Sequence, residues 1–458
     1  MKGKVVKAGL FGLLALALIV LPLIGACAPP EEPEAPPEEP PEVEKPSTVK
    51  VAYIGDLTGP YAAVGPPLIQ GWTEYMEMVN QRGGIDGVPI QALWADTKAE
   101  APLATAAYKR FKAQGVLCVS CMVTPIGLAL QGLLNEDKIP GINQAATLSF
   151  YFPPQDYMWC HGGVNTDYEL ACLYYFDTEL WDREAWGTWT LGWLAHDNPF
   201  ALGGGAGMYK YADTYGVNLV KPEVVALGTL DYSANIMRLV DAGANVIMVD
   251  SLGSASGLIL KQMGELGVIA TSVEEAATVP GKIVPFFGYT SYYVTAMAGA
   301  EEYFKYTYGA RGYAADWEEE YPGVKEWRDF MLDKYGQVPD PKKGGTDLRE
   351  GWHNAMVMVA AIERALEAVG WENLNGETLM EYGLKELSFD ARGYSAATGY
   401  ADYEGDRINL QSFALAAYNE EHGDFAAITP YLNIPETLPE CEVTDYMTTQ
   451  GGPGWYTP

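Results

Sequence analysis

Apolar positions from Val49 onward alternate between two spacings. The stretch "VKVAYIGDL" is almost continuously apolar, which is typical of a strand covered by helices on both faces. The apolar residues after it recur at three- and four-residue spacing and predict one face of a helix that ends at Gly83-Gly84: Leu68, Ile69, Trp72, Met76 and Val79. A strand followed by such a helix predicts the start of a β-α-β unit.

The alternation continues along the chain and then begins a second time. Strands are predicted at "PIQALWAD", "GVLCVSCMV" and "IPGINQAA", with helices from Pro102 to about Gln114 and after Pro125. A second series places strands at "WGTWTLGWLAHD", "PEVVALG", "ANVIMVDS" and "KIVPFFG", with helices between them. We therefore expect an α/β fold of two lobes, each a doubly wound parallel sheet, with a ligand cleft at the carboxyl ends of the strands. Later helices near 324–335 and 347–369 are expected to pack on the first lobe.

The first residues predict an export signal. Three lysines precede an apolar run over residues 8–23, and the small residues of 24–26 lead directly to Cys27. This order resembles the bacterial lipoprotein signal, in which the cysteine becomes the lipidated first residue of the mature chain. We expect a signal peptide over 1–26, then the lipidated Cys27 and a disordered Pro/Glu tether over 27–48. An uncleaved transmembrane anchor is the alternative, because the apolar run approaches the roughly 20 residues that span a bilayer.

Composition limits the kinds of partner that the protein can bind and the kinds of reaction that it can catalyse. The formal charge of −31 argues against binding to nucleic acid and against docking on anionic lipid. With only four histidines, no H-E-x-x-H, no G-x-S-x-G and no G-K-[ST] loop, the chain offers little for an enzyme. The "GGGAG" at 203–207 lies inside a helical segment, whereas a dinucleotide loop opens a helix directly after a strand. We expect no catalytic residue, no cofactor and no metal.

The cysteines beyond Cys27 raise two questions. In an exported protein one or two disulfides are plausible, and Cys160 with Cys172 is the first pair to test; Cys441 is a further thiol. Cys118 and Cys121 form a C-x-x-C within a buried-strand pattern, where residues three apart point to opposite faces. We therefore interpret this motif as core packing rather than as a redox or zinc site.

Three loops at predicted strand ends carry candidate binding residues. The Gly/Pro-rich loop "GDLTGPYAAVGPP" brings Tyr61 to the mouth of the cleft. Thr124 before Pro125 is a helix-start pattern with Thr at the N-cap, and a helix N-terminus offers free N–H groups and partial positive charge to an anion such as a carboxylate. Thr147 follows a strand and adds a hydroxyl and a backbone N–H. An ordinary cap or turn is the alternative for each threonine.

The segments "VKVAYIGDLTGPYAAVG", "NQRGGIDGVPIQALWAD" and "IPGINQAAT" resemble, in this order and spacing, the periplasmic binding proteins of branched-chain amino acid ABC transporters, the leucine/isoleucine/valine type. The resemblance extends from about Val49 to Ile428 and is strongest in the first lobe. It implies two α/β lobes joined by three hinge strands that close on a small ligand. The lobes are then expected over 49–165 with about 305–408, and over 166–304 with about 409–435, before a C-terminal tail over 436–458.

The resemblance also implies a set of ligand-binding positions. Thr124 and Thr147 hold the ligand carboxylate, and the backbone at Ala145 helps to hold its ammonium group. Two positions depart from the family pattern: Phe200 stands where a tyrosine is usual, and "FFGYTSYY" gives Tyr289 and Thr290 where an acid pairs with the ammonium. The complete expected set is Tyr61, Thr124, Ala145, Ala146, Thr147, Phe200, Ser251, Tyr289 and Thr290.

The missing acid leaves the amino end of the ligand open. A buried ammonium without an acid partner is costly, and Asp231 or Asp250 is a possible substitute. An aromatic lining from Tyr61, Phe200, Tyr289 and Tyr292 favours a ligand with an apolar or flat part, with core packing as the alternative for the second-lobe aromatics.

We expect an exported, lipid-anchored solute receptor outside the cell membrane or in the periplasm. It captures a small solute bearing a carboxylate or an amide and delivers it to an ABC transporter permease. A sensory module that reports to a membrane receptor is the alternative, and an exported enzyme is a weaker one.

Overall fold

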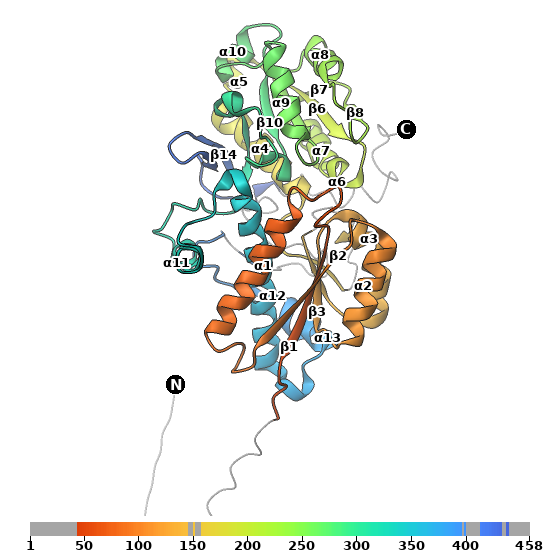
Figure 1. Cartoon of the computed structure of the whole chain (residues 1–458). Coiled ribbons are helices and arrows are strands. Elements are labelled where there is room, and N and C mark those ends of the chain that lie inside the picture. The colour runs from red at the N-terminus through yellow and green to blue at the C-terminus, as the bar shows by residue number, and fades with distance from the viewer. Residues whose placement is uncertain are drawn as a thin grey trace, which may run out of the picture. The chain divides into compact units, whose positions relative to one another are not determined.

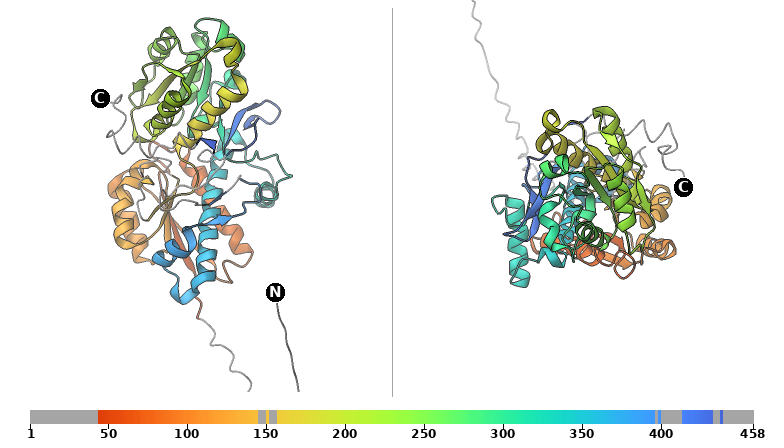
Figure 2. Two further views of the ribbon diagram at one scale, coloured as in Figure 1. Left: turned by 180° about the vertical axis from the view of Figure 1, so that it is seen from behind. Right: turned by 90° about the horizontal axis from the view of Figure 1, so that it is seen from above.

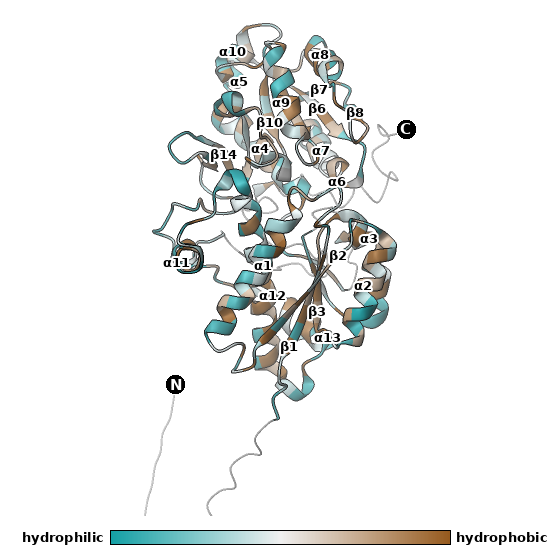
Figure 3. Ribbon diagram, viewed as in Figure 1, coloured by the Kyte–Doolittle hydropathy of each residue, from teal (hydrophilic) through white to brown (hydrophobic). Residues whose placement is uncertain are grey.

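The computed structural model describes residues 44–144, 150–151, 157–395, 398–399, 413–432 and 437–438, and two large sheets with helices on their faces form its framework (Figure 1). Figure 3 shows hydrophobic residues along the central strands and polar residues on much of the outward helix surface. This arrangement confirms the α/β fold with two parallel-sheet lobes that the alternating pattern predicts.

The first sheet is parallel and has the order β2-β1-β3-β4-β5. Its strands are β1 (Val49–Gly55), β2 (Ile90–Asp96), β3 (Cys118–Cys121), β4 (Gly141–Asn143) and β5 (Met158–Cys160). Its main helices are α1 (Gly65–Gln81), α2 (Ala101–Ala113), α3 (Thr124–Asp137) and α12 (Gly345–Val369). The helices α1 and α12 pack side by side, as do α2 and α3, so helices cover both faces as the apolar strands predict (Figure 2).

The second sheet has the order β15-β14-β11-β10-β9-β6-β7, with β8 also paired to β6. Its strands are β6 (Thr190–His196), β7 (Asn218–Leu219), β8 (Glu223–Val225), β9 (Val246–Asp250), β10 (Val284–Phe287), β11 (Tyr308–Arg311), β14 (Ala414–Asn419) and β15 (Asp424–Ala427). The pairs β11–β14 and β14–β15 are antiparallel, and the other pairs are parallel. Its helices include α4 (Asn165–Tyr175), α7 (Gly205–Tyr215), α8 (Ser233–Asp241) and α9 (Ala255–Glu265).

Further elements make up the rest of the described secondary structure. They are the α-helices α5 (Arg183–Trp186), α6 (Pro199–Leu202), α10 (Val273–Thr278), α11 (Pro322–Tyr335) and α13 (Gly376–Thr378), the 3₁₀ turns Tyr289–Tyr292, Glu301–Tyr306, Pro341–Lys343 and Trp371–Asn373, the π-helical turns Phe176–Leu180 and Leu379–Leu384, and the pair β12 (Ser388–Phe389) with β13 (Thr398–Gly399). Among the described residues, no helix is both long and apolar enough to cross a membrane.

The chain passes between the sheets at two described places. It leaves the first sheet after β5 to enter α4, and it leaves the second after β11 to reach α11 and α12. The third predicted crossing, near 408, lies outside the described residues. The lobe boundaries drawn from the sequence stay a prediction.

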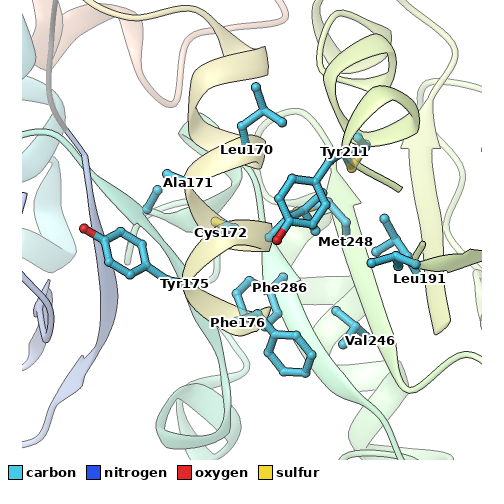
Figure 4. Packing of buried hydrophobic residues seen from close by; sticks show 14 of the residues in the cluster. Leu170, Ala171, Cys172, Tyr175, Phe176, Leu191, Tyr211, Val246, Met248 and Phe286 are labelled. Atoms are coloured by element: carbon cyan, nitrogen blue, oxygen red, sulfur yellow. The ribbon is translucent and has the colours of Figure 1, made fainter. Parts of the chain in front are cut away.

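Aromatic and aliphatic side chains fill the second lobe between α4 and its sheet (Figure 4). Phe176 lies edge-on to Trp189 and to Phe286, with ring centroids 5.0 and 5.4 Å apart. The "GGGAG" segment belongs to this packing, because a Cβ added at Gly207 would lie 2.3 Å from Thr166 Cγ2 and one at Gly204 would lie 2.3 Å from Glu169 Cδ. These glycines therefore let α7 approach α4 closely. The segment does not lie inside one helix as expected, because Gly203 and Gly204 connect α6 to α7, which begins at Gly205.

The structure describes four cysteines, all of them buried, and no disulfide joins any two of them: Cys118, Cys121, Cys160 and Cys172. The expected Cys160–Cys172 disulfide is therefore wrong, because Cys160 packs in the core of the first lobe and Cys172 in that of the second. Cys118 and Cys121 lie in the two clusters on opposite faces of the first sheet, which confirms the core-packing interpretation. Burial raises the pKa of the Cys121 and Cys160 thiols to about 12, so both stay protonated and unreactive.

A buried pair of acids, Glu169 on α4 and Asp250 at the end of β9, lies inside the second lobe. The Trp193 indole donates to Asp250 Oδ2 at 2.6 Å. Burial raises the pKa of Asp250 to about 6, and burial together with the Asp250 charge raises that of Glu169 well above its usual value. Two carboxylates cannot both ionise cheaply in this space, so the pair holds a proton at neutral pH.

A glycine pair sets the distance between α1 and α12. A Cβ added at Gly71 would lie 1.8 Å from the Leu348 carbonyl oxygen, and one added at Gly351 would lie 1.9 Å from the Leu68 carbonyl oxygen. Only glycine fits at either position, since a backbone atom cannot move aside as a side chain tip can.

We predict that Gly71→Ala lowers the free energy of unfolding by about 1 to 3 kcal/mol, because the added methyl forces two packed helices apart. The matched control is Gly132→Ala on α3, where the added Cβ meets nothing within 4 Å. An alanine there is expected to add about 0.5 to 1 kcal/mol, since it removes backbone freedom from the unfolded chain. Equal urea midpoints for the two variants would contradict the close helix packing.

The second prediction concerns the acid pair. A carboxyl group with a raised pKa binds its proton more tightly in the folded chain, so stability is highest at low pH and falls as pH rises through the folded pKa. Asp250→Asn removes this group at nearly constant shape. We expect the loss of stability between pH 5 and pH 8 to be smaller in this variant than in the parent by about 1 kcal/mol.

The control is Asp231→Asn. Backbone and side-chain hydrogen bonds from Ser233 lower the pKa of exposed Asp231, so its contribution changes only as pH falls toward about 4. Urea unfolding at pH 5 and pH 8 measures the change in the free energy of unfolding between these pH values. If this change is the same in the parent and both variants, the buried acid pair does not titrate as described.

Candidate functional site

A pocket lies at the carboxyl ends of the first-sheet strands, where the second lobe faces them. Its lining residues are Tyr61, Val64, Leu68, Met122, Val123, Thr124, Gln144, Phe200, Leu252, Asp347 and Glu350. The cavity volume is about 50 Å³, and the wider hollow around it, which is open to solvent, measures about 490 Å³. The pocket is therefore narrow, and residues of both lobes line it.

Tyr61 reaches the pocket through a loop that one buried acid organises. The Asp56 carboxylate accepts from the N–H groups of Gly59 at 2.6 Å and Tyr61 at 2.9 Å. Asp56 itself is fully buried directly after β1. The loop therefore has a fixed form, and the structure places Tyr61 on the pocket wall as the sequence predicts.

Thr124 also lines the pocket, at the start of α3. The helix begins one residue earlier than predicted: Val123 is the N-cap residue, and Thr124 is the first helical position before Pro125. The N-cap expectation for Thr124 is thus wrong by one position, which is the usual uncertainty of a helix boundary read from sequence. The buried Thr124 still lies at the positive end of the helix dipole.

Gln144 follows β4 and lines the pocket beside Thr124. Its Oε1 accepts from the Tyr53 hydroxyl, while its Nε2 is buried without a hydrogen-bond partner. The three positions after it that the resemblance implies, Ala145, Ala146 and Thr147, lie outside the described residues, and their role stays a prediction.

The second lobe contributes Phe200 on α6 and Leu252 after β9. Ser251 does not line the pocket, because its hydroxyl bonds Ser256 Oγ at 2.7 Å and its N–H donates to Ser291 Oγ at 2.9 Å. Tyr289 and Thr290 form part of a 3₁₀ turn, and their side chains lie outside the described positions. The second lobe thus offers apolar contact in place of the expected serine.

Neither acid considered for the amino end lines this pocket, and Tyr292, considered for the aromatic lining, does not line it either. Asp231 is exposed, and Asp250 is buried against Trp193 and Glu169. Tyr292 packs in the core, stacked on Phe425 with centroids 4.0 Å apart, so core packing is the correct reading of this aromatic.

Two acids that the sequence analysis missed line the pocket from α12. Asp347 is fully buried, and Glu350 is 2% exposed. Thr295 Oγ1 donates to Asp347 Oδ2 at 3.1 Å, and the Tyr293 hydroxyl donates to Glu350 Oε2 at 2.8 Å. Both donors follow β10, so α12 and the second lobe meet at these carboxyl groups. The available signal was their spacing of three residues near the start of a helix, which places both acids on one face.

The groups around these acids are mostly neutral. Burial, followed by the Glu350 charge, raises the pKa of Asp347 well above its usual value, and the opposing effects are the Thr295 hydrogen bond and the more distant Arg311. Burial lowers the pKa of His161 to about 4, and its Nε2 lies 3.9 Å from Glu350 Oε1. Burial and the neighbouring Glu350 charge therefore favour the neutral form of Asp347.

The pocket shows no catalytic arrangement. Neither a histidine nor a cysteine lines it, and the described residues contain no cluster of three or more His, Cys, Asp or Glu side chains that would suit a metal ion. What the lining can do is enclose a small molecule, with polar groups at Thr124, Gln144 and α12 and apolar walls between them.

The chain is similar in sequence and in fold to known proteins. The chain is 24% identical over 227 residues to "Leu/Ile/Val-binding protein homolog 3" of Brucella melitensis, a match that covers 48% of this chain and 59% of that relative. It therefore spans less than two thirds of the curated relative that it matches.

Two solved structures share the fold. The branched-chain amino acid ABC transporter protein of Thermus thermophilus with bound valine has a TM-score of 0.71 and 20% identity, and the match covers 85% of this chain and 97% of that one. The fatty acid ABC transporter substrate-binding protein of Thermomonospora curvata has a TM-score of 0.70 and 19% identity, with 84% and 92% covered. These likenesses confirm the two-lobed fold expected from the resemblance.

The family described as "Periplasmic binding protein" matches residues 48–422. The family and the relatives named above are binding proteins and not enzymes, in agreement with the absence of catalytic motifs in the sequence. The chain belongs to the periplasmic binding protein family.

Proposed function

We propose that the protein is the extracytoplasmic, lipid-anchored solute-binding component of an ABC importer. It captures a small, amino-acid-like solute bearing a carboxylate or an amide and delivers it to a permease. The observation that carries the proposal is the pocket itself, because residues of both lobes enclose it and it has polar ends and apolar walls.

Thr124 at the start of α3 supports an anionic or amide end of the solute. A helix N-terminus carries partial positive charge and presents N–H groups, which suits a carboxylate. Tyr61 and Phe200 form apolar walls from opposite lobes, which suits a hydrocarbon or aromatic body. Closure removes water from the solute, so its polar ends need fixed partners in the pocket.

The proposal predicts that some amino acids, their amides or small carboxylates stabilise the purified chain. Melting is followed by its tryptophan fluorescence, and a ligand at 100 times its dissociation constant adds about 2.7 kcal/mol. For a ligand found in this way, Thr124→Ala should weaken binding by about 1 to 3 kcal/mol, the cost of leaving a buried polar group unpaired.

The matched control is Thr73→Ala on α1, where the hydroxyl donates to the Ile69 carbonyl oxygen within its own helix and does not face the pocket. Unchanged affinity in Thr124→Ala would place the carboxylate site elsewhere. A panel with no ligand at all would overturn the proposed solute class.

The lipid anchor has its own test. Cys27→Ser should remove the protein from the membrane fraction and leave ligand binding unchanged, because the cysteine is proposed to carry the lipid and the pocket belongs to residues 61–350. Fractionation of cells checks this outcome. If the variant stays in the membrane, an uncleaved N-terminal helix holds the protein instead.

A further inference from the structure

Two buried polar atoms of the pocket residues have no hydrogen-bond partner in the part of the chain that the structure describes. One is the carboxyl oxygen Asp347 Oδ1, which accepts a hydrogen bond once the group is ionised, and the other is the amide donor Gln144 Nε2. Asp347 is 0% exposed and Gln144 is 6% exposed, so water does not freely compensate either atom. Unpaired buried polar groups are rare and costly. A bound molecule that gives a donor to Asp347 and an acceptor to Gln144 removes both costs.

The charged groups that line the pocket indicate which kind of hydrogen-bond donor a bound molecule should carry. Asp347 and Glu350 lie one helical turn apart on α12, and each already accepts from one hydroxyl of the second lobe. Among the described residues that line the pocket there is no lysine or arginine. The buried Arg311 is already paired with Asp424, with Nη2 and Oδ1 3.0 Å apart. A pocket with two carboxyl groups and no cation of its own favours a positively charged group.

The second lobe meets both acids with hydroxyl groups. The segment after β10 supplies Tyr293 and Thr295, and these hydroxyls donate to the α12 carboxyl groups. The negative charge thus comes to this edge of the pocket from α12 rather than from the strand end in the second lobe.

We propose that Asp347 holds the cationic group of the solute, with Glu350 beside it, and that the site therefore selects molecules bearing a protonated amine. The inference rests on the proposed function and names the chemical class that its pocket selects. Asp347 ionises as the ammonium group docks, and Gln144 Nε2 donates to an oxygen of the same molecule. A carboxylate solute without an amine brings no cation to the two acids and brings its negative charge toward that of Glu350.

The experiment measures separately how much the amine and the carboxylate of a solute contribute to binding. The probes are leucine, leucinamide, 4-methylpentanoate and 4-methylpentanamide, which share one hydrocarbon shape, and the corresponding four compounds of the phenylalanine shape. Titration calorimetry on the full chain gives their dissociation constants. Loss of the amine should weaken binding about 10- to 100-fold, the range for a hydrogen bond to a charged group.

Asp347→Asn should reduce the difference between amine-bearing and amine-free probes to less than about threefold, because a neutral amide gains little from an ammonium ion. Asp250→Asn is the matched control, since it also removes a buried acid but lies outside the pocket lining. It should keep the full difference. Melting curves test whether each variant folds. If Asp347→Asn does not fold, the inference is tested by Glu350→Gln and by the parent chain's own preference between amine-bearing and amine-free probes.

Three outcomes are distinguishable. A preference for amines that Asp347→Asn removes supports the inference. Amine-free probes that bind the parent chain as tightly as their amine-bearing partners, or a preference that Asp347→Asn leaves unchanged, overturn it while the proposed function stands. If no probe of either shape binds, the proposed solute class is wrong and the inference falls with it.

Discussion

The contact between α12 and the segment after β10 is the interaction on which the rest of the site depends. It joins the lobes through two hydrogen bonds to buried carboxyl groups, from Thr295 to Asp347 and from Tyr293 to Glu350. A buried acid is costly unless its oxygens are paired, so these bonds are available only when the lobes come together as they do here. The same contact borders the pocket through Asp347 and Glu350, and it leaves one Asp347 oxygen without a partner among the described residues.

Helix α12 can carry these acids because its position is fixed from the other side. Gly71 and Gly351 let it lie against α1 at backbone distance, and Asn354 Nδ2 donates to the Ile142 carbonyl oxygen of β4 at 3.0 Å. The helix thus connects the core of the first lobe to the pocket. Rigid elements that hold a few polar groups in place are what a selective small-molecule site requires.

Sequence pattern predicted the parts of the molecule that local periodicity determines. The spacing from Leu68 to Val79 predicted α1, and the strand pattern around Cys118 and Cys121 predicted that these thiols point to opposite faces. Tyr61 and Thr124 reach the pocket because strand ends in a parallel sheet share one edge.

Long-range packing determined the parts that the sequence did not predict. Asp347 and Glu350 lie far along the chain from Thr124, and nothing local indicates that α12 reaches the same pocket. Cys160 and Cys172 are close in sequence but belong to different cores, so their short spacing suggested a disulfide that does not form. The cap at α3 was misplaced by one residue because helix ends depend on weak local preferences.

The central claim is that a neutral, buried Asp347 becomes the partner of a cation when solute binds. The most direct measurement is the number of protons released when leucine binds at pH 6, from calorimetric titrations in two buffers of different ionisation enthalpy. The account predicts a release close to one proton per site, which Asp347→Asn abolishes. Leucine binding with no proton release, or with the same release in the variant, would contradict it.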